Sequence, residues 1–280
     1  MLIRSSPPNR KAKLGIRSTC LGTIIFIFIA AAAHGDTFTI RIPDKLDTPS
    51  LQRSHKALQT FFEAYTGEKF RIDVGNELSL LREPLTNTGI IISAAHSLGA
   101  LAKDKNVIPL AMFDDIAAFV VVVSGIDESI YQLSDLSGKS ICSEQIPALF
   151  TLHLLFSIDN PNREPIILPL PTDERKLRQL AMGNCSAAVI NIETYLKASA
   201  ANESLRIIFQ SRTMPTYGIG INSSLPSPLK NRLEQIIFSK EANSLLQSFI
   251  VPLTGAPGQI IKPDLKRLKS LSAVLENWGY

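Results

Sequence analysis

Residues 117–142 read AAFVVVVSGIDESIYQLSDLSGKSIC, and this stretch decides the fold. Its first part, Ala117–Val123, is too apolar to face water on either side, which indicates a strand buried in a sheet. A Ser124-Gly125 break follows, and a second strand is expected over Lys139–Cys142. A buried strand that leaves one sheet and is soon followed by the first strand of another is how a chain crosses between two α/β lobes. Two such lobes form a cleft between them, and clefts bind ligands.

The segment between these strands carries a resemblance to a known family. Leu133-Ser-Asp135-Leu136-Ser-Gly138-Lys139, placed after an apolar strand and Ser-Gly, resembles the lobe-crossing signature of type 2 periplasmic solute-binding proteins. Over roughly residues 37–250 the chain is most similar to the phosphate/phosphonate-binding branch of that superfamily. The resemblance implies an α/β fold of two lobes, in which two parallel-type mixed sheets are joined by two crossing strands. Taken alone, the run leaves open that Gly138 only ends a helical turn and Asp135 only caps one.

Strand and helix patterns alternate along most of the chain, as in parallel α/β sheets with right-handed crossovers. Strands are expected at 38–42, 70–74, 89–93, 139–142, 165–170, 185–190 and 205–209, and after about residue 226 only helices. The inferred first lobe comprises residues 36–122 and 215–280, and the second comprises 123–214. Crossings near Ser124 and near Thr213 would join the two lobes.

The N-terminus is typical of an export signal. Five basic residues precede an apolar run of 13 residues, Leu21–Ala33, and small residues predict cleavage after Ala33 or after Gly35. A run of 13 is short for a membrane-spanning helix, which needs about 20 apolar residues, although an uncleaved anchor stays open. The sequence therefore predicts a signal peptide over residues 1–35 and a periplasmic mature protein.

Charge and composition narrow the class of partner. Five of the 29 basic residues lie in the predicted signal and none of the 25 acidic residues does, so the mature chain has one more acidic than basic residue. No basic stripe then remains to favour nucleic acid. No metal, phosphate-loop or hydrolase motif occurs, so neither a cofactor nor an enzyme is expected. A monomer is expected.

Two cysteines remain in the mature chain, Cys142 and Cys185. An exported protein offers an oxidising environment, which favours a disulfide. The strand pattern argues against it, because Cys142 would end one strand and Cys185 would begin its parallel neighbour. Those positions would be roughly 10 Å or more apart at about 3.3 Å per residue, which is too far for a bridge. The sequence thus favours free thiols.

The ligand of such a fold would lie beyond the carboxyl ends of the strands, where helix N-termini offer unpaired N–H groups. Four loops should reach that place: Pro43–Lys45, Ser93–Ser97, Ser143–Leu149 and Ile190–Glu193. The predicted ligand-binding residues in and beside these loops are His96, Ser97, Ser143, Gln145, Asn191 and Tyr217. Each could instead serve the structure alone, as a helix cap or a packing residue.

The third loop departs from the pattern that the resemblance implies. The phosphonate branch has a Ser/Thr-rich run there that binds phosphoryl oxygens, whereas this chain has Pro147, Ala148 and Leu149. Proline has no N–H to donate, and Glu144 would repel an anion. The loop therefore fits a neutral, cationic or partly apolar ligand at least as well as a phosphate- or phosphonate-like oxyanion.

Three functions follow from these observations. The first is an exported solute-binding protein that closes over a small ligand and delivers it to an ABC transporter permease. The second is a periplasmic accessory or sensor protein that uses the same fold with a degenerate cleft and binds a partner protein. The third, a secreted enzyme, would need a nucleophile and base, for which only Cys142 with His96 could be considered.

Overall fold

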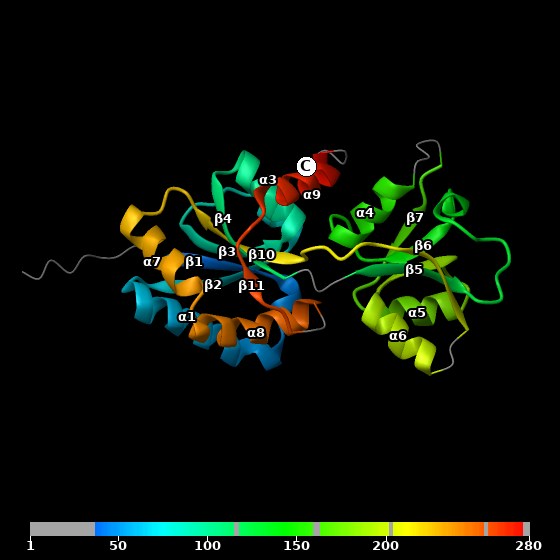
Figure 1. Ribbon diagram of the computed structural model, residues 1–280, viewed down its shortest axis with the longest axis horizontal. Coiled ribbons are helices and arrows are strands. Elements are labelled where there is room, and N and C mark those ends of the chain that lie inside the picture. Colours follow the sequence, from blue (N-terminus) through cyan, green and yellow to red (C-terminus); the bar gives the residue numbers. More distant parts are fainter. Residues whose placement is uncertain (1–36, 115–117, 159–162, 202–203, 255–256, 277–280) are drawn as a thin grey trace, which may run out of the picture. The chain divides into compact units, whose positions relative to one another are not determined.

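The computed structural model describes residues 37–276 except for 115–117, 159–162, 202–203 and 255–256. The predicted signal peptide and its cleavage sites lie outside the described residues. Within them, no helix has the length and apolar character that crossing a membrane requires. The described strands form two sheets, one of six strands and one of five (Figure 1).

The six-stranded sheet has the order β11-β4-β10-β3-β1-β2. Strands β1 (Phe38–Pro43), β2 (Phe70–Gly75) and β3 (Thr88–Ala94) are parallel to one another. Strand β10 (Tyr217–Asn222) is antiparallel to β3 and to β4 (Val107–Phe113), and the short β11 (Ile260–Ile261) closes the far edge. Most of these strands match the alternating and apolar runs of the sequence.

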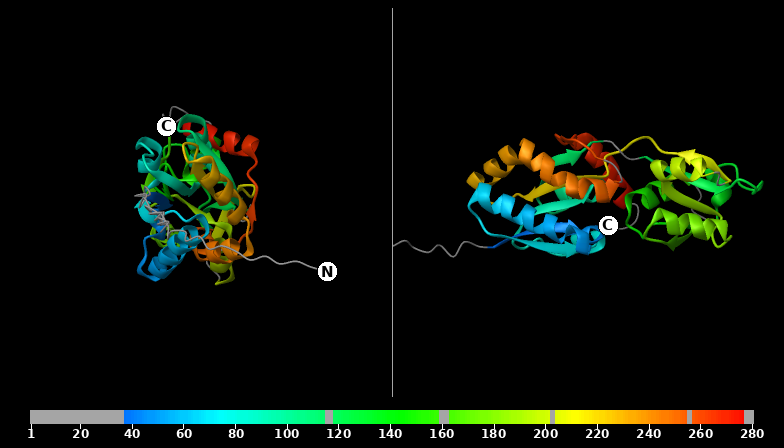
Figure 2. Two further views of the ribbon diagram at one scale, coloured as in Figure 1. Left: turned by 90° about the vertical axis from the view of Figure 1, so that its left-hand side faces the viewer. Right: turned by 90° about the horizontal axis from the view of Figure 1, so that it is seen from below.

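Helices cover both faces of the six-stranded sheet. On one face lie α1 (Gln52–Thr66), α7 (Ser227–Ile237) and α8 (Lys240–Thr254), which share one apolar core with β1 and β10 (Figures 1 and 2). On the other lie α2 (Glu77–Arg82), α3 (Ala95–Asp104) and the C-terminal α9 (Leu265–Glu276), packed around Ile91, Leu98 and Leu268. Both faces of β3 are therefore buried, which explains the apolar run at residues 89–92.

The five-stranded sheet has the order β7-β6-β8-β5-β9. Strands β6 (Ser140–Ser143), β7 (Ile166–Pro169) and β8 (Ala187–Asn191) are parallel, and β5 (Phe119–Ser124) is antiparallel to both β8 and β9 (Leu205–Gln210). One face packs on α4 (Leu149–Ser157) and the other on α5 (Asp173–Ala181) and α6 (Ile192–Ala200). This confirms the predicted fold class of two mixed α/β sheets.

The first crossing lies earlier in the chain than the sequence predicts. Residues up to 122 were expected in the first lobe, yet all of β5 pairs within the five-stranded sheet, so the chain leaves the first sheet after Phe113 and before Phe119. The second change of sheet occurs between β9 and β10, in a segment that includes Thr213. The apolar character of β5 is explained by burial on both faces, which does not reveal the sheet to which a strand belongs.

The prediction of free thiols is wrong, because Cys142 and Cys185 form a disulfide with their Cα atoms 5.8 Å apart. Strand β8 begins only at Ala187, and Cys185 lies in a bend before it. Ser186 donates its N–H to the Ser140 carbonyl, which brings the bend alongside β6. The assumed separation along two straight strands therefore does not apply, and Cys142 has no free thiol to act as a nucleophile.

Candidate functional site

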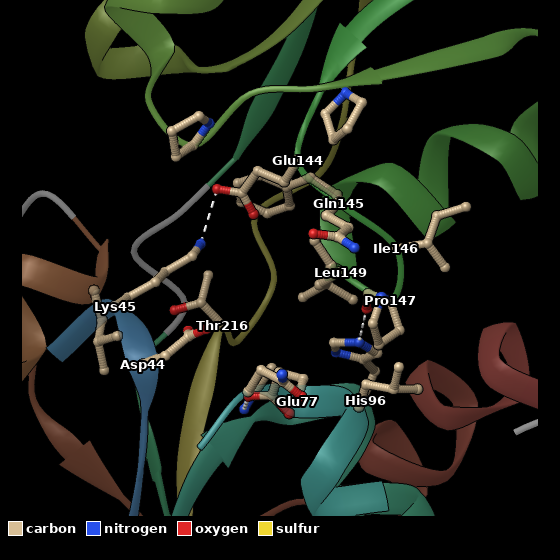
Figure 3. Close-up of a pocket in the computed structure, with 18 of the residues that line it drawn as sticks. Asp44, Lys45, Glu77, His96, Glu144, Gln145, Ile146, Pro147, Leu149 and Thr216 are labelled. Atoms are coloured by element: carbon tan, nitrogen blue, oxygen red, sulfur yellow. Dashed lines mark hydrogen bonds and ion pairs between the residues drawn. The ribbon is translucent and has the colours of Figure 1, made fainter. Parts of the chain in front are cut away.

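A cavity of about 400 Å³ is lined by residues from both sheets (Figure 3). Its walls come from the turns that follow β1, β2, β3, β6, β7 and β8, together with the start of β10 and the C-terminal part of α8. The lining residues are Asp44, Lys45, Asn76, Glu77, Leu78, Ala94, His96, Glu144–Phe150, Pro169–Pro171, Asn191, Thr216, Tyr217 and Leu253. Because the carboxyl ends of parallel strands meet at one edge of a sheet, these turns gather there by topology.

His96 lies in the first turn of α3 and is fully buried. Its Nε2 is 2.6 Å from the carbonyl oxygen of Pro147, in the turn between β6 and α4. A carbonyl can only accept, so Nε2 carries the proton and Nδ1 does not. Burial lowers the pKa of His96 to about 4, although the bond to Pro147 opposes this shift. His96 is therefore a neutral group that links the two sheets at one side of the cavity.

Lys45 and Glu144 form a second link between the sheets. The Nζ of Lys45 is 2.8 Å from Oε1 of Glu144, and 42% of the lysine side chain is exposed. Partial burial alone would lower the pKa of Lys45, but the Tyr217 phenol and the Glu144 and Glu77 carboxylates outweigh it and raise that pKa. For Tyr217, burial has the opposite effect and raises the pKa of the phenol to about 12. At neutral pH the cavity thus contains a charged lysine, already paired, and an un-ionised phenol.

Glu77 is the first residue of α2 and contributes a carboxylate to the cavity wall (Figure 3). Its Oε1 accepts the backbone N–H of Ala94 at 2.9 Å, whereas Oε2 has no hydrogen-bond partner among the described residues. Burial raises the pKa of the Glu77 carboxyl, and the Ala94 N–H, the Ser97 hydroxyl and Lys45 only partly offset it. Glu77 makes no ion pair with the described residues.

Side chains and backbone carbonyls already occupy most of the helix N-termini at this edge. The amide oxygens of Asn76 and Asn191 accept backbone N–H groups in the first turns of α2 and α6. At α3, Glu77 takes the Ala94 N–H and the Thr216 carbonyl takes the Ala95 N–H. Helix α4 has no side-chain cap. These contacts occupy part of the set of backbone donors that a bound anion would otherwise use at this edge.

Four of the six predicted ligand-binding residues line the cavity: His96, Gln145, Asn191 and Tyr217. Ser97 and Ser143 do not. Ser97 is fully buried beneath the α3 turn, and the Ser143 hydroxyl is hydrogen-bonded to Thr151 at 2.7 Å. Ser97 lies in the first turn of α3, where its hydroxyl acts on the Glu77 carboxyl and opposes the rise in pKa that burial causes, whereas Ser143 ends β6 and its hydroxyl is directed to α4. A ligand contact for the four lining residues remains a prediction.

Sequence reasoning missed Glu77, Asn76 and Thr216. Asn76 and Glu77 follow the alternating strand β2 and open α2, and an Asn before a helical run is a recognisable cap signal. That signal places the pair at a strand-to-helix turn, but it does not show that β2 ends beside the turns of β1 and β3. Thr216 immediately precedes β10. Within the described residues, no group of three or more His, Cys, Asp or Glu side chains could hold a metal ion.

Comparison with known proteins agrees with this geometry. A family model described as "ABC transporter, phosphonate, periplasmic substrate-binding protein" matches residues 44–253. No curated protein matches the sequence. Among solved structures, XAC2383 from Xanthomonas citri bound to ATP has a TM-score of 0.69 at 12% identity, covering 86% of this chain and 97% of that one.

Two further solved structures share the fold. PhnD1 from Prochlorococcus marinus in complex with methylphosphonate has a TM-score of 0.63 at 12% identity, covering 87% of this chain and 98% of that one. A binding protein component of an ABC phosphonate transporter from Pseudomonas aeruginosa has a TM-score of 0.61 at 11% identity, covering 86% of each chain. At such low identities, the likeness establishes a common fold and does not identify a ligand.

Proposed function

We propose a function from one premise: the chain belongs to the family of phosphonate-type periplasmic substrate-binding proteins of ABC transporters. Such a protein binds a solute and presents it to a transporter. The function that we propose for this chain is to hold one small solute in the cavity of about 400 Å³ and deliver it to an ABC permease. Drug-sized ligands occupy pockets of about this volume.

The main support for the proposal is that turns from both sheets form the cavity wall. The turns after β1, β2 and β3 belong to the six-stranded sheet, and those after β6, β7 and β8 belong to the five-stranded sheet. Two polar contacts, His96 with Pro147 and Lys45 with Glu144, join the same two sets of turns (Figure 3). A solute that contacts both sets stabilises the arrangement in which they face each other, which is how a ligand shifts a conformational equilibrium.

Solute capture tests the proposal directly. The mature chain is incubated with a bacterial metabolite extract and washed, and the released molecules are identified by mass spectrometry. Ala148→Trp, which adds an indole to the cavity wall, serves as the blocked variant. The native chain should retain a solute that Ala148→Trp does not, while both unfold cooperatively. Capture by neither would overturn the proposal and favour the accessory or sensor function, in which a protein partner replaces the solute.

Delivery requires a second measurement. Cells that contain the chain should take up the captured solute faster than cells that lack it, because an ABC importer of this type depends on its binding protein. Cells with Ala148→Trp should behave like the cells that lack the protein. Equal uptake in all three would contradict the transport role while leaving solute binding intact.

The remaining proposals concern export and assembly. We propose that residues 1–35 direct the chain to the periplasm, with cleavage after Ala33 or Gly35, and N-terminal sequencing of the exported protein distinguishes the two positions. We also propose that the protein works as a monomer and without catalysis. The disulfide supports the absence of thiol catalysis, because it engages the cysteine that the sequence would offer as a nucleophile.

A further inference from the structure

The charges around the cavity are mostly negative. Three carboxylates line it, those of Asp44, Glu77 and Glu144, against the single ammonium of Lys45. Lys45 is paired with Glu144 at 2.8 Å, so this pair contributes little net charge. No arginine lines the cavity, and His96 is neutral because burial lowers its pKa to about 4. Within the described residues, Asp44 and Glu77 make no ion pair. Burial raises the pKa of the Glu77 carboxyl, and a bound cation would favour its ionised form, so both carboxyl groups are placed to balance a positive charge.

Glu77 occupies a position that an anionic ligand would need. The start of α3 offers backbone N–H groups toward the cavity, and such a terminus is a common anion site. Here the Glu77 carboxylate itself accepts the Ala94 N–H at 2.9 Å, and the Thr216 carbonyl accepts that of Ala95. The chain thus supplies its own anion at α3. A bound phosphonate would have to displace this carboxylate or lie beside it, and like charges repel.

Helix α4 is a feature that favours an anion. Its first turn lines the cavity and has no side-chain cap. An uncapped helix N-terminus is equivalent to about half an elementary charge, which is less than the full charges of the two unpaired carboxylates. In addition, Pro147, Ala148 and Leu149 supply neither a hydroxyl nor, in the case of proline, an N–H. The balance of charges therefore favours a cation.

Besides polar residues such as Asn76, Gln145 and Asn191, the wall has a large apolar and aromatic part. It includes Leu78, Ile146, Leu149, Phe150, Leu170 and Leu253. Contact between such side chains and an apolar part of a ligand removes both from water and stabilises the complex. An aromatic face such as that of Phe150 also attracts cations. A small, strongly hydrated inorganic ion would leave this part of the cavity unused.

We propose, resting on the solute-binding function above, that the cavity binds an organic cation: a protonated amine or quaternary ammonium attached to an apolar portion. Glu77 is its counter-charge and Asp44 adds attraction at the rim. The apolar portion lies against the wall that α4 and the turn after β7 contribute. The protein then differs in ligand class from the phosphonate after which its family is named.

Matched pairs of probes test this inference by calorimetry and by thermal unfolding. Each pair has the same carbon skeleton, and its second member lacks the basic nitrogen: 2-aminoethylphosphonate with ethylphosphonate, 4-aminobutanoate with butanoate, and phenethylamine with 2-phenylethanol, in which a neutral hydroxyl replaces the amine. The inference predicts that at least one amine binds and that its counterpart binds at least tenfold more weakly. Solutes captured from the metabolite extract should also carry a basic or quaternary nitrogen.

Three variants identify the counter-charge. Glu77→Gln keeps the shape and an acceptor for the Ala94 N–H but removes the charge, and it should weaken amine binding about 10- to 100-fold. Asp44→Asn, at an exposed position, should weaken it about two- to fivefold. Glu83→Gln is the matched control, because this carboxylate directly follows α2 but is paired with Arg41 outside the cavity. It should leave the affinity unchanged.

The outcomes separate this inference from the proposed function. If ethylphosphonate or another nitrogen-free solute binds as tightly as its amine, or if Glu77→Gln retains full affinity for the amine, the cation inference fails and the solute-binding function stands. If neither a probe nor an extract solute binds, both fail. Amine binding that is lost in Glu77→Gln and kept in Glu83→Gln supports both.

Discussion

The Nε2 of His96 donates a hydrogen bond across 2.6 Å to the carbonyl oxygen of Pro147, and the two residues follow strands of different sheets. The donor belongs to the first turn of α3, and the acceptor lies just before α4. Because the imidazole is fully buried, water cannot readily replace the carbonyl as its partner. Together with the Lys45–Glu144 pair, this bond joins the two sets of cavity turns, and the buried site that it occupies favours the neutral imidazole.

Stability should fall as the pH drops from 6.5 toward 4, because the folded state disfavours protonated His96. Its pKa is lowered to about 4 in the folded protein and is about 6.5 when unfolded, so the unfolded chain binds the extra proton in this range. At pH 5 the linkage costs about 2 kcal/mol. His96→Gln cannot titrate, so its loss of unfolding free energy between pH 7 and 5 should be smaller than that of the native chain by about this amount. Equal losses in urea titrations would contradict the assignment.

Glu77→Gln should stabilise the ligand-free protein at neutral pH. Burial raises the pKa of Glu77 in the folded state, so ionised Glu77 disfavours folding above the unfolded pKa of about 4.3. The amide removes that cost and should add on the order of 1 kcal/mol to the free energy of unfolding at pH 7. Near pH 4, where the carboxyl is protonated in the folded chain, the gain should shrink.

The comparison with Glu83→Gln shows whether the increase in stability is specific to the carboxylate in the cavity. Glu83 is exposed and paired with Arg41, so its amide should not stabilise the chain. A Glu77→Gln variant less stable than the native protein at pH 7 would show that the carboxylate serves the fold. Higher stability with weaker amine binding is the expected trade-off for a group retained for its ligand.

Much of this architecture could be predicted from local sequence patterns. Helix periodicity, cap residues and the apolar run of β3 depend on neighbours in the chain, so the strands and helices fall close to their expected positions. The strand-to-helix turns also follow, because a parallel strand must be followed by a crossover. His96 and Asn191 could therefore be placed at the cavity edge before the structure was known.

Relationships between distant segments could not be predicted in this way. Strand β5 belongs to the second sheet because Val120 pairs with Ile190 and Gln210, and no local pattern records that pairing. The disulfide depends on a bend before β8. The role of Glu77 depends on α2 starting close enough to α3 for a side chain to reach the Ala94 N–H. Each of these is a contact in three dimensions.

The disulfide should contribute substantially to the stability of the five-stranded sheet. Cys142 and Cys185 are separated by 43 residues, and a cross-link over a loop of that size restricts the unfolded chain by about 2–4 kcal/mol. The double variant Cys142→Ser/Cys185→Ser should lose about this much unfolding free energy in urea, and the native chain should lose a similar amount under dithiothreitol. Full stability in the double variant, or a native mass that shows two free thiols, would exclude the bridge.

The final prediction concerns the docking of α9 on α3. A Cβ atom added at Gly99 would lie 2.5 Å from the Leu268 carbonyl oxygen and 3.0 Å from the Ser272 side chain. The first contact is with backbone and cannot be relieved by a rotamer change, so Gly99→Ala should push the helices apart and cost about 1–3 kcal/mol of unfolding free energy. The strain outweighs the better helix propensity of alanine, which favours the variant by less than about 1 kcal/mol.

A nearby surface change provides the control. Lys103→Ala, one turn further along α3, removes only the exposed pair with Glu276 and should leave the urea midpoint almost unchanged. Because α9 also shares an apolar cluster, Val274 and Leu275, with Leu152 of α4, displacing it should loosen the contact beside the cavity as well. Gly99→Ala is therefore expected to weaken solute binding, whereas Lys103→Ala is not. If Gly99→Ala proved as stable and as tightly binding as Lys103→Ala, close packing of α9 would not be needed for either property.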